Sequence, residues 1–393
     1  MHLTRLSLTD FRNYREAEVT LGPGVTTFLG SNGQGKTNLV EAAGYLATFG
    51  SHRVATDAPL IRQGADRAIL RGVVSSAGRD SLLEIEINAG RANRVRLNKA
   101  PAPRPREVLG VLRCVLFAPE DIAVVKGDPD QRRRYLDDLL VAHRPRYAGV
   151  RADYERVLRQ RTALLKSAKS RGAIPPGALE VWDDHLVTAG VQLTAGRLRL
   201  VRELRPLVAS CYSAVSGTER DTSARYRMSA ISAAAASADP QAGGPYADPG
   251  RTAEGLDPEP DVEKLAITLR EALAARRRAE LERAVCLVGP HRDELELGIG
   301  GLPARGYASH GESWSLALAL RLVGYQLLRS AGDDPVLMLD DVFAELDSGR
   351  RDRLAELVSD AEQVLVTAAV PEDVPPGLAG AKFRVADGVI CGA

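Results

Sequence analysis

Apolar and polar residues follow strand-like patterns through most of the first hundred positions. One stretch departs from them: in TNLVEAAGYLATF (37–49) apolar residues recur every three or four positions, which predicts a helix. Farther on, VLRCVLFAP (111–119) is apolar enough to predict a buried strand that stops at Pro119. The other segments that predict strands are RLSLTDF (5–11), VTTFLG (25–30), AILRGVVSS (68–76), LLEIEINAG (82–90) and RVRLNKA (94–100).

Near residue 127 the pattern changes to a Leu- and Arg-rich one with helical spacing, which continues to about residue 214. Asp128 can accept the first backbone N–H groups of a helix, and Pro129 suits its first position. We therefore predict several helices here, with a break at GAIPPG (172–177).

Residues 232–260 are rich in Ala, Gly, Pro and Asp, and we predict that 215–262 is a flexible insertion. A charged helix follows at 263–284, and VCLVGPH (285–291) returns to a strand-like pattern. The layout predicts an α/β domain made of both chain ends, with a mainly helical domain inserted between them.

The composition is typical of a folded protein without a membrane segment. Of 393 residues, 45% are hydrophobic and 26% charged, and the net charge of +1 excludes a chain that is basic throughout, although not one with local basic faces. The four cysteines form no CxxC pair, which indicates a reducing compartment. Because no signal-peptide core and no run of about 18 apolar residues occurs, we expect a cytoplasmic location and no membrane.

A phosphate-binding motif follows the predicted strand VTTFL. GSNGQGKT satisfies G-x-x-x-x-G-K-[ST] and precedes the predicted helix, although a glycine-rich turn is the alternative. Glycines let the backbone wrap a phosphate chain, and N–H groups point at its oxygens. Lys36 then contacts the β- and γ-phosphates, and the Thr37 hydroxyl holds Mg²⁺. The predicted nucleotide-binding residues are Gly30, Ser31, Asn32, Gly33, Gln34, Gly35, Lys36 and Thr37.

A second candidate site is PVLMLDD, where the apolar run 336–339 is typical of a parallel strand covered on both faces. It ends in Asp340 and Asp341. An aspartate that leaves such a strand beside a phosphate loop can hold Mg²⁺, directly or through water. The next carboxylate is placed to orient or deprotonate the attacking water. A purely structural strand end is the alternative, which the phosphate loop disfavours.

Three interpretations fit SHGE, which opens a long apolar run. Ser309 and Glu312 satisfy the capping box S-x-x-E. A Ser–His hydrolase pair is disfavoured, because adjacent turn residues do not naturally face each other and G-x-S-x-G is absent. The third interpretation comes from chain order: a phosphate loop, a distant Ser-x-Gly opening a helix, an apolar strand ending in DD, and AELD (344–347) occur in this order in ABC-type ATPases. Ser309 and Gly311 would then bind the γ-phosphate held by a second copy's phosphate loop.

Together these motifs resemble the RecF family of DNA-repair ATPases, relatives of the SMC heads. The matching segments cover nearly the whole chain apart from 215–262. The resemblance implies an α/β fold, an ABC-type P-loop ATPase head made of residues 1–126 and 283–393, with an inserted, mainly helical second domain at 127–282. The segments are DFRNY, GSNGQGKTNLVEA, SHR, FAPEDIAVVKGDPDQRRRYLD, VGPHRDEL, ASHGE and VLMLDDVFAELD.

The resemblance also implies a function. It implies ATP and Mg²⁺ as cofactors, a homodimer that forms on ATP binding, and slow, DNA-stimulated hydrolysis in which Lys36, Ser309 and Asp341 act. It further implies binding to single-stranded or gapped and to double-stranded DNA without sequence specificity. The implied partners are RecR and RecO and, indirectly, the RecA recombinase, in replication-gap repair and SOS induction.

Several residues depart from the general ABC pattern. Asp341 stands where many ABC ATPases carry Glu, and its shorter side chain is consistent with a switch rather than a fast motor. His310 and Glu312 replace the usual Gly and Gln of the signature. Thr367 lies near the position at which ABC enzymes carry a switch histidine, so the residue that senses the γ-phosphate is not identified. In addition, no glutamine ends the VLFAP strand.

Two further sets of residues keep two interpretations each. His291 and Arg292 are either a satisfied core histidine and a salt-bridged arginine, or, as the resemblance suggests, residues near the nucleotide or the domain junction. Arg12, Asn13 and Arg53 are either exposed loop residues or neighbours of the adenine or phosphates.

Three basic clusters also keep two interpretations: solvated helix faces, or the lining of a DNA-holding groove in a dimer. They are Arg132 to Arg134, the Arg144 to Arg161 series, and Arg276 to Arg278. Because aromatic residues make up only 5% and no recognition motif occurs, we predict sequence-independent binding with a steep salt dependence.

Three rival functions are weighed against this one. A transporter ATPase is disfavoured by the helical insertion, DFRNY and GPHRDE. An SMC-like head acting as a DNA tether is disfavoured because no sustained heptads are present. A non-hydrolysing DNA-binding scaffold with structural ATP stays open.

Overall fold

The computed structural model describes residues 1–171, 177–232, 259–332 and 334–392, which form two compact units. The predicted break at 172–176 and residues 233–258 of the predicted insertion lie outside the described residues. Helices α5 (Ala178–Ser216) and α9 (His310–Ser330) each contribute residues to both units. Unit 1 consists of Met1–Ile122, Ser210–Glu219 and Trp314–Ala393, and unit 2 of Ala123–Ala209 and Arg220–Ser313.

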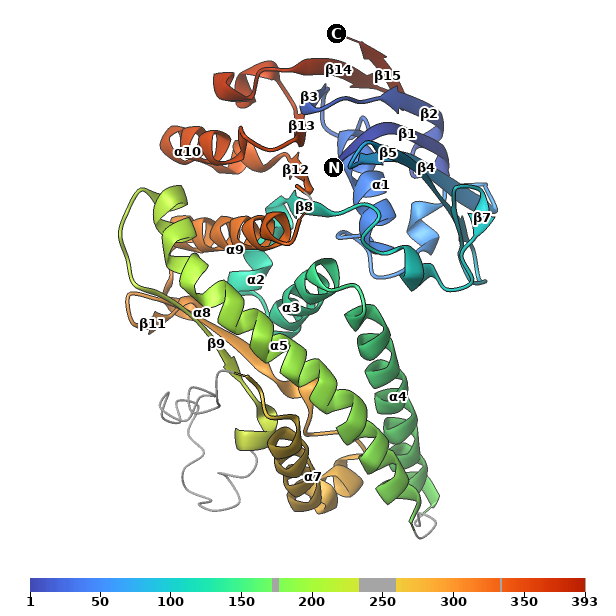
Figure 1. Cartoon of the computed structure of the whole chain (residues 1–393), viewed down its shortest axis with the longest axis vertical. Helices are drawn as coiled ribbons and strands as arrows, with labels where there is room; N and C mark the ends of the chain where they lie inside the picture. The colour runs from blue at the N-terminus through green and yellow to red at the C-terminus, as the bar shows by residue number, and fades with distance from the viewer. Residues whose placement is uncertain (172–176, 233–258, 333, 393) are drawn as a thin grey trace. The chain divides into compact units, whose positions relative to one another are not determined.

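Unit 1 contains a six-stranded sheet with the order β15-β14-β3-β13-β12-β8, which combines strands from both chain ends (Figure 1). All neighbours pair in parallel except β14 and β15. Because parallel strands end at the same edge of a sheet, the segments after β3, β12 and β13 leave at one edge. The strands are β3 (Gly24–Leu29), β8 (Cys114–Phe117), β12 (Val336–Asp340), β13 (Gln363–Ala368), β14 (Ala381–Ala386) and β15 (Val389–Gly392).

A second sheet of unit 1 is wholly antiparallel, with the order β2-β1-β4-β5-β6-β7. Its alternating sequences place apolar residues on one face, as Leu6 and Leu8 on β1 show. Its strands are β1 (His2–Phe11), β2 (Tyr14–Thr20), β4 (Arg67–Ser76), β5 (Arg79–Asn88), β6 (Arg94–Leu97) and β7 (Ala100–Pro101).

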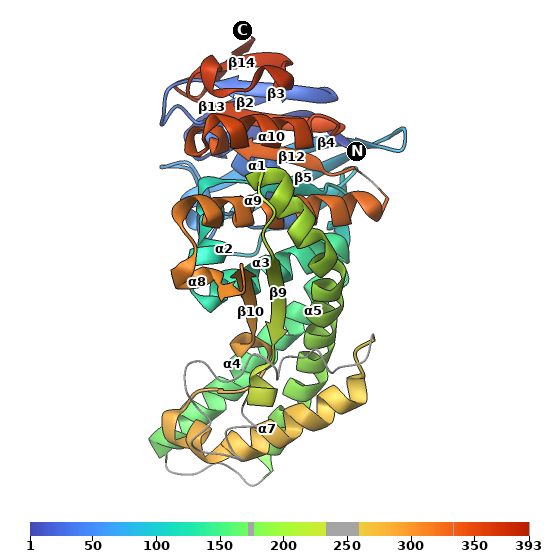
Figure 2. The ribbon, with the colours of Figure 1, turned by 90° about the vertical axis from the view of Figure 1, so that its left-hand side faces the viewer.

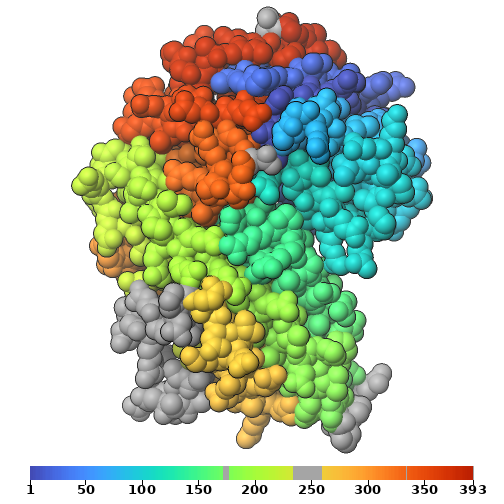
Figure 3. All heavy atoms as spheres, viewed as in Figure 1, coloured from blue at the N-terminus to red at the C-terminus, as the bar shows by residue number. Residues whose placement is uncertain are grey.

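Helix α1 (Lys36–Thr48) packs within unit 1 and contacts strands of both sheets (Figure 2). Its Leu39 and Leu46 belong to a core cluster that also contains Leu70 of β4 and Met338 of β12. On the surface, the C-terminal strands, red in Figure 3, lie against the N-terminal ones, blue. Burial of residues from both chain ends in one core fixes the helix start, and hence the phosphate loop before it, against the parallel sheet. Helix α10 (Ser348–Val358) also lies wholly in unit 1.

Unit 2 combines helices with a three-stranded antiparallel sheet of the order β11-β10-β9. Its strands are β9 (Thr222–Arg227), β10 (Glu294–Ile299) and β11 (Leu302–Pro303). Besides its parts of α5 and α9, its helices are α3 (Pro129–His143), α4 (Tyr147–Arg171), α7 (Val262–Arg283) and α8 (Ala304–Tyr307), and α2 (Ile122–Lys126) begins at the unit boundary. None of the helices in the described part of the chain has the length and apolar character needed to cross a membrane.

Three local predictions need correction. Asp128 occupies the N-cap of α3 without a side-chain cap bond, because its carboxylate pairs with Arg305 at 2.8 Å. VCLVGPH does not form a strand: residues 285–289 are irregular, and the strand begins only at Glu294. Part of the predicted flexible insertion is ordered, since Thr222–Arg227 forms β9.

Candidate functional site

The loop between β3 and α1 has a backbone that only glycine adopts easily. Gly33 and Gly35 have φ values of +84° and +113°, in the left-handed region. A Cβ on Gly35 would lie 2.7 Å from the Asn13 amide, and one on Gly30 would lie 2.2 Å from the Val385 carbonyl oxygen. Close packing therefore requires glycine at positions 30 and 35, and the backbone conformation favours it at 33 and 35.

Lys36 begins α1 and is almost completely buried, with 3% exposure. Its ammonium turns back over the loop and donates to the Ser31 carbonyl at 3.3 Å and the Asn32 side chain at 3.5 Å. Both hydrogen bonds are long for a buried charge. The first turn of α1 carries no acidic residue, so the helix N-terminus keeps its positive end. The loop therefore offers an ammonium and backbone donors to an anion.

Asp340 ends β12 with only 3% of its surface exposed. Burial raises the pKa of its carboxyl to about 6, while hydrogen bonds from Thr367 and Thr37 oppose the rise. The Thr37 hydroxyl, at the end of the phosphate loop, is therefore close enough to Asp340 to lower the pKa of its carboxyl.

The donor set around Thr37 and Asp340 suits Mg²⁺, because a hydroxyl and a carboxylate are hard oxygen ligands. Within residues 1–171, 177–232, 259–332 and 334–392 no group of three or more His, Cys, Asp or Glu side chains could hold a metal. A Mg²⁺ ion at this place would thus depend on phosphate oxygens and water for its other ligands, which is the usual arrangement at nucleotide sites.

Asp341 has φ +49°, which is rare for a residue other than glycine. Its N–H donates to the Thr367 hydroxyl oxygen at 2.9 Å. The side chain is half-buried, directly after the buried β12. A strained backbone that a buried side chain holds in place is typical of functional positions.

Ser309 and Glu312, in unit 2, form the predicted capping box. The Ser309 N–H donates to Glu312 Oε2 at 2.9 Å, and the Glu312 N–H donates to Ser309 Oγ at 3.3 Å. The cap lowers the pKa of Glu312, which also pairs with Arg220 at 2.9 Å. Ser309 and His310 are both exposed, so the hydroxyl can serve the cap and still meet a second molecule.

Arg12, Asn13 and Arg53 converge on α1 and the phosphate loop. Arg12 forms two hydrogen bonds, of 2.8 and 2.6 Å, with Glu41, whose side chain is fully buried. Asn13 donates to the Gln34 carbonyl at 3.1 Å, and Arg53 donates to Asn38 at 2.9 Å. Asn13 thus contacts the loop directly, whereas Arg12 and Arg53 bind residues of α1 and both pair with the buried Glu41.

His291 has both ring nitrogens engaged within unit 2. Because the Cys286 carbonyl only accepts, Nε2 donates to it at 3.1 Å, and Nδ1 accepts from the Tyr154 hydroxyl at 2.6 Å. Burial lowers the pKa of His291 to about 4, so the ring is neutral at pH 7. Arg292 donates to the same carbonyl at 3.1 Å. These contacts support the interpretation of His291 as a satisfied core histidine.

Many arginines of the three basic clusters are already paired. Arg132 is 5% exposed and forms two hydrogen bonds with Glu294, and Arg161 is fully buried between Asp183 and Glu280. Further pairs involve Arg144 with Glu203, Arg151 with Asp138, Arg156 with Asp153, Arg277 with Glu180 and Arg278 with Glu282. Arg132 and Arg161 therefore cannot line an open groove.

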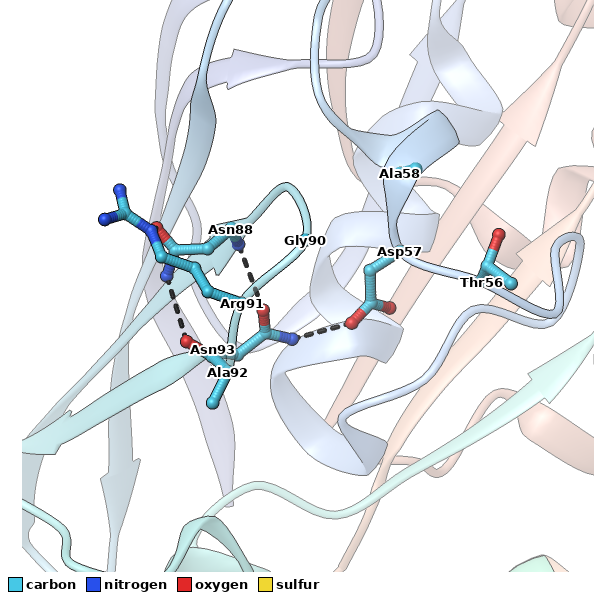
Figure 4. Close-up of a pocket in the computed structure, with 8 residues that line it drawn as sticks. All are labelled: Thr56, Asp57, Ala58, Asn88, Gly90, Arg91, Ala92 and Asn93. Atoms are coloured by element: carbon cyan, nitrogen blue, oxygen red, sulfur yellow. Dashed lines mark hydrogen bonds between the residues drawn. The ribbon is translucent and has the colours of Figure 1, made fainter.

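A shallow pocket of about 580 Å³ lies in unit 1 (Figure 4). Its polar groups bind one another: Asn93 donates to Asp57 at 2.6 Å and to the Tyr45 hydroxyl at 3.0 Å. None of the predicted site residues lines it. Its residues are Thr56, Asp57, Ala58, Asn88, Gly90, Arg91, Ala92 and Asn93.

Sequence reasoning missed Glu41 and Glu120. Although burial alone would raise the pKa of Glu41, hydrogen bonds from Arg12 and Ser51 lower it. Glu120 follows β8 and is close enough to Asp340 to contribute to the raised pKa there. A carboxylate after the strand-ending Pro119 was visible in the sequence, but only the pairing of β8 with β12 places it at this edge.

The geometry of the site defines a class of protein. A glycine-rich loop and helix N-terminus, with a metal-type aspartate on the next strand but one of a parallel sheet, define a P-loop nucleotide-binding head. The RecF/RecN/SMC N terminal domain family matches residues 2–375. Together with the relatives described next, this match shows that the chain belongs to the RecF family, which confirms the predicted resemblance.

Similar proteins cover the whole chain. The DNA replication and repair protein RecF of Kineococcus radiotolerans is 58% identical over 392 residues, 97% of this chain and 96% of that protein. RecF of Frankia alni is 55% identical over 99% of both. A structure of the recombination mediator protein RecF-ATP in the RecFOR pathway has a TM-score of 0.86 at 26% identity, covering 100% of this chain and 97% of the other. An SMC head from Pyrococcus furiosus shares the fold, with a TM-score of 0.51 at 15% identity.

Proposed function

We propose that this chain is an ATP-dependent DNA-binding protein of recombinational and replication-gap repair. The observation that carries the proposal is the buried Lys36 ammonium folded over the loop after β3, with the buried Asp340 ending β12 of the same parallel sheet. Family membership supports the biological context, because the relatives are DNA replication and repair proteins.

The residues divide the work of nucleotide binding. Loop amides from Gly30 to Thr37 and the Lys36 ammonium bind the phosphates, and Thr37 and Asp340 would hold Mg²⁺. When bound, Mg²⁺ neutralises charge on the phosphate oxygens. Asp341 orients or deprotonates the attacking water. Hydrolysis is slow, which is consistent with a switch rather than a fast motor.

A second copy completes the site. Ser309 and Gly311 of one chain close over the γ-phosphate bound by its partner's loop, so ATP binding drives dimerisation. The exposed Ser309 hydroxyl and the N-terminus of α9 supply the donors. Gly311 matters because the backbone must approach the phosphate closely.

The dimer binds single-stranded or gapped and double-stranded DNA through its phosphates, without sequence specificity. Its partners are RecO and RecR, through which it helps to load RecA. The pairing of Arg132 and Arg161 restricts the DNA-contacting arginines to others on the surface.

The test has two stages. Titration with a fluorescent ATP analogue should show saturable binding that Lys36→Ala removes. Binding to gapped DNA should then be strengthened by ATP and weakened steeply by added salt. Nucleotide binding that survives Lys36→Ala, or DNA affinity unchanged between low and moderate salt, would contradict the proposal. A single-turnover hydrolysis assay separates it from a non-hydrolysing scaffold.

A further inference from the structure

Thr367 lies near the end of β13, at the edge of the parallel sheet where β3 and β12 also end. Strand β13 lies between β3 and β12. Its side chain is 1% exposed, and its register partner on β12 is Asp340. The hydroxyl donates to Asp340 Oδ1 at 2.7 Å and accepts the Asp341 N–H at 2.9 Å. One hydroxyl group thus joins two consecutive acidic residues.

The number of protons on this hydroxyl limits what Thr367 can do. A threonine hydroxyl has one proton to donate, and here Asp340 receives it. While that bond is held, Thr367 cannot also donate to a γ-phosphate. It is therefore unsuited to the sensor role that its place in the sequence left open.

The bond to Asp341 has a separate consequence. Asp341 has φ +49°, a conformation that costs free energy for any residue with a Cβ. The bond from its N–H to Thr367 helps to hold that conformation, which sets the direction in which the Asp341 side chain leaves the backbone. Without the hydroxyl, this N–H and an oxygen of Asp340 would both lose a buried partner.

We propose that Thr367 is a positioning residue that fixes the Asp340 carboxylate for Mg²⁺ and the Asp341 carboxylate for water. The proposal rests on the proposed function, since it assigns Thr367 a role in nucleotide hydrolysis. Hydrogen-bond partners of metal ligands commonly have this effect, and their loss costs about 10- to 100-fold in metal affinity or activity.

The test compares Thr367→Val, which keeps the shape and loses the hydroxyl, with Thr367→Ser, which keeps the hydroxyl. Thr27→Val is the matched control, because Thr27 is also 1% exposed and lies on the adjacent β3. Three quantities are measured: affinity for a fluorescent ATP analogue without Mg²⁺, the Mg²⁺ concentration that half-saturates the change in that affinity, and the single-turnover hydrolysis rate.

For Thr367→Val we expect metal-free nucleotide affinity within about twofold of the wild type. The half-saturating Mg²⁺ concentration should rise, and the hydrolysis rate should fall, each by about 10- to 100-fold. Thr367→Ser should restore both, and Thr27→Val should leave both unchanged. If Thr367 had a purely structural role, removal of its hydroxyl would not specifically change the Mg²⁺ dependence, and keeping the hydroxyl in Thr367→Ser would not preserve it.

Two results would overturn the proposal: Mg²⁺ dependence and hydrolysis rate close to the wild type in Thr367→Val, or a loss in Thr367→Ser as large as in Thr367→Val. If Thr367→Val folds poorly, Thr367→Ala gives the same comparison by the same readouts. A wild-type chain that binds no nucleotide would instead refute the proposed function. Failure of the wild type and failure of the variant are therefore distinguishable.

Discussion

Arg12 and Glu41 form a two-pronged ion pair, with nitrogen–oxygen distances of 2.8 and 2.6 Å, that joins the end of β1 to α1. The Glu41 side chain is fully buried and also accepts the Ser51 hydroxyl at 2.6 Å. Arg12 belongs to DFRNY, one of the segments that resemble the RecF family. The buried Glu41 therefore holds this segment in place within unit 1.

The Glu41→Gln substitution should therefore destabilise unit 1. It removes the charge from a buried group with three donors, and we expect the free energy of unfolding to fall by about 2–3 kcal/mol. Urea denaturation of full-length protein measures the change. Glu84→Gln is the control, because its partner Arg71 is 43% exposed and such pairs contribute less than about 1 kcal/mol. Equal effects of the two substitutions would contradict the account.

The same pair predicts a pH dependence. The pKa of Glu41 is lowered in the folded protein from its ordinary value of 4.5. Its contribution to stability is thus complete above pH 4.5 and is lost as the pH falls through the lower folded pKa. Wild-type stability should fall toward that of Glu41→Gln as unfolding is measured at successively lower pH below 4.5. A constant difference between them would refute the assignment.

His291 predicts a separate pH effect in unit 2. Its folded pKa of about 4 lies below the ordinary value of 6.5, so the unfolded chain binds the proton first as the pH falls. Stability should decrease between pH 6.5 and 4, by at most about 3 kcal/mol for this group. His291→Gln removes the titrating group and should flatten that part of the profile. A profile as steep as the wild type would show that other groups titrate there.

Lys36→Ala should abolish ATP binding, because the loop loses the buried ammonium that lies over Ser31. Lys99→Ala, at an exposed position of the same unit, should bind as the wild type does. Isothermal titration with ATP and Mg²⁺ measures both. Retained binding in Lys36→Ala would contradict the assignment of the phosphate loop.

The sequence predicted those parts of the site that depend on near neighbours. The glycine-rich loop, the strand ending in Asp340 and the Ser309–Glu312 capping box each lie within a few consecutive residues, and local chemistry specifies them. The parts that it missed depend on distant partners. Asp128 binds Arg305 rather than its own helix, and Arg132 binds Glu294, 162 positions away.

Thr367 illustrates the same limit at the candidate site. Its place near the usual position of the switch histidine was visible, but the side that its hydroxyl faces depends on the pairing of β13 with β12. The order of strands in a parallel sheet is set by packing of both chain ends into one core, which no local pattern records. Burial of charged side chains, such as the fully buried Arg161, was hidden for the same reason.

Ser309→Arg tests the role assigned to the exposed cap. A long cationic side chain at the start of α9 should block approach of a second copy, while the phosphate loop still binds ATP. Ser359→Arg introduces the same change at an exposed position after α10 and should leave dimerisation intact. Nucleotide titration and sedimentation of each variant measure the two properties. Normal ATP-dependent dimerisation of Ser309→Arg would exclude Ser309 from the shared site.

The central claim is that two copies of the chain share each bound ATP. Sedimentation velocity of the wild-type protein, with and without saturating ATP and Mg²⁺, tests it most directly. We predict a species of 42.2 kDa without nucleotide and one of twice that mass with it. A mass that stays at one chain under saturating nucleotide, with or without DNA, would contradict the account.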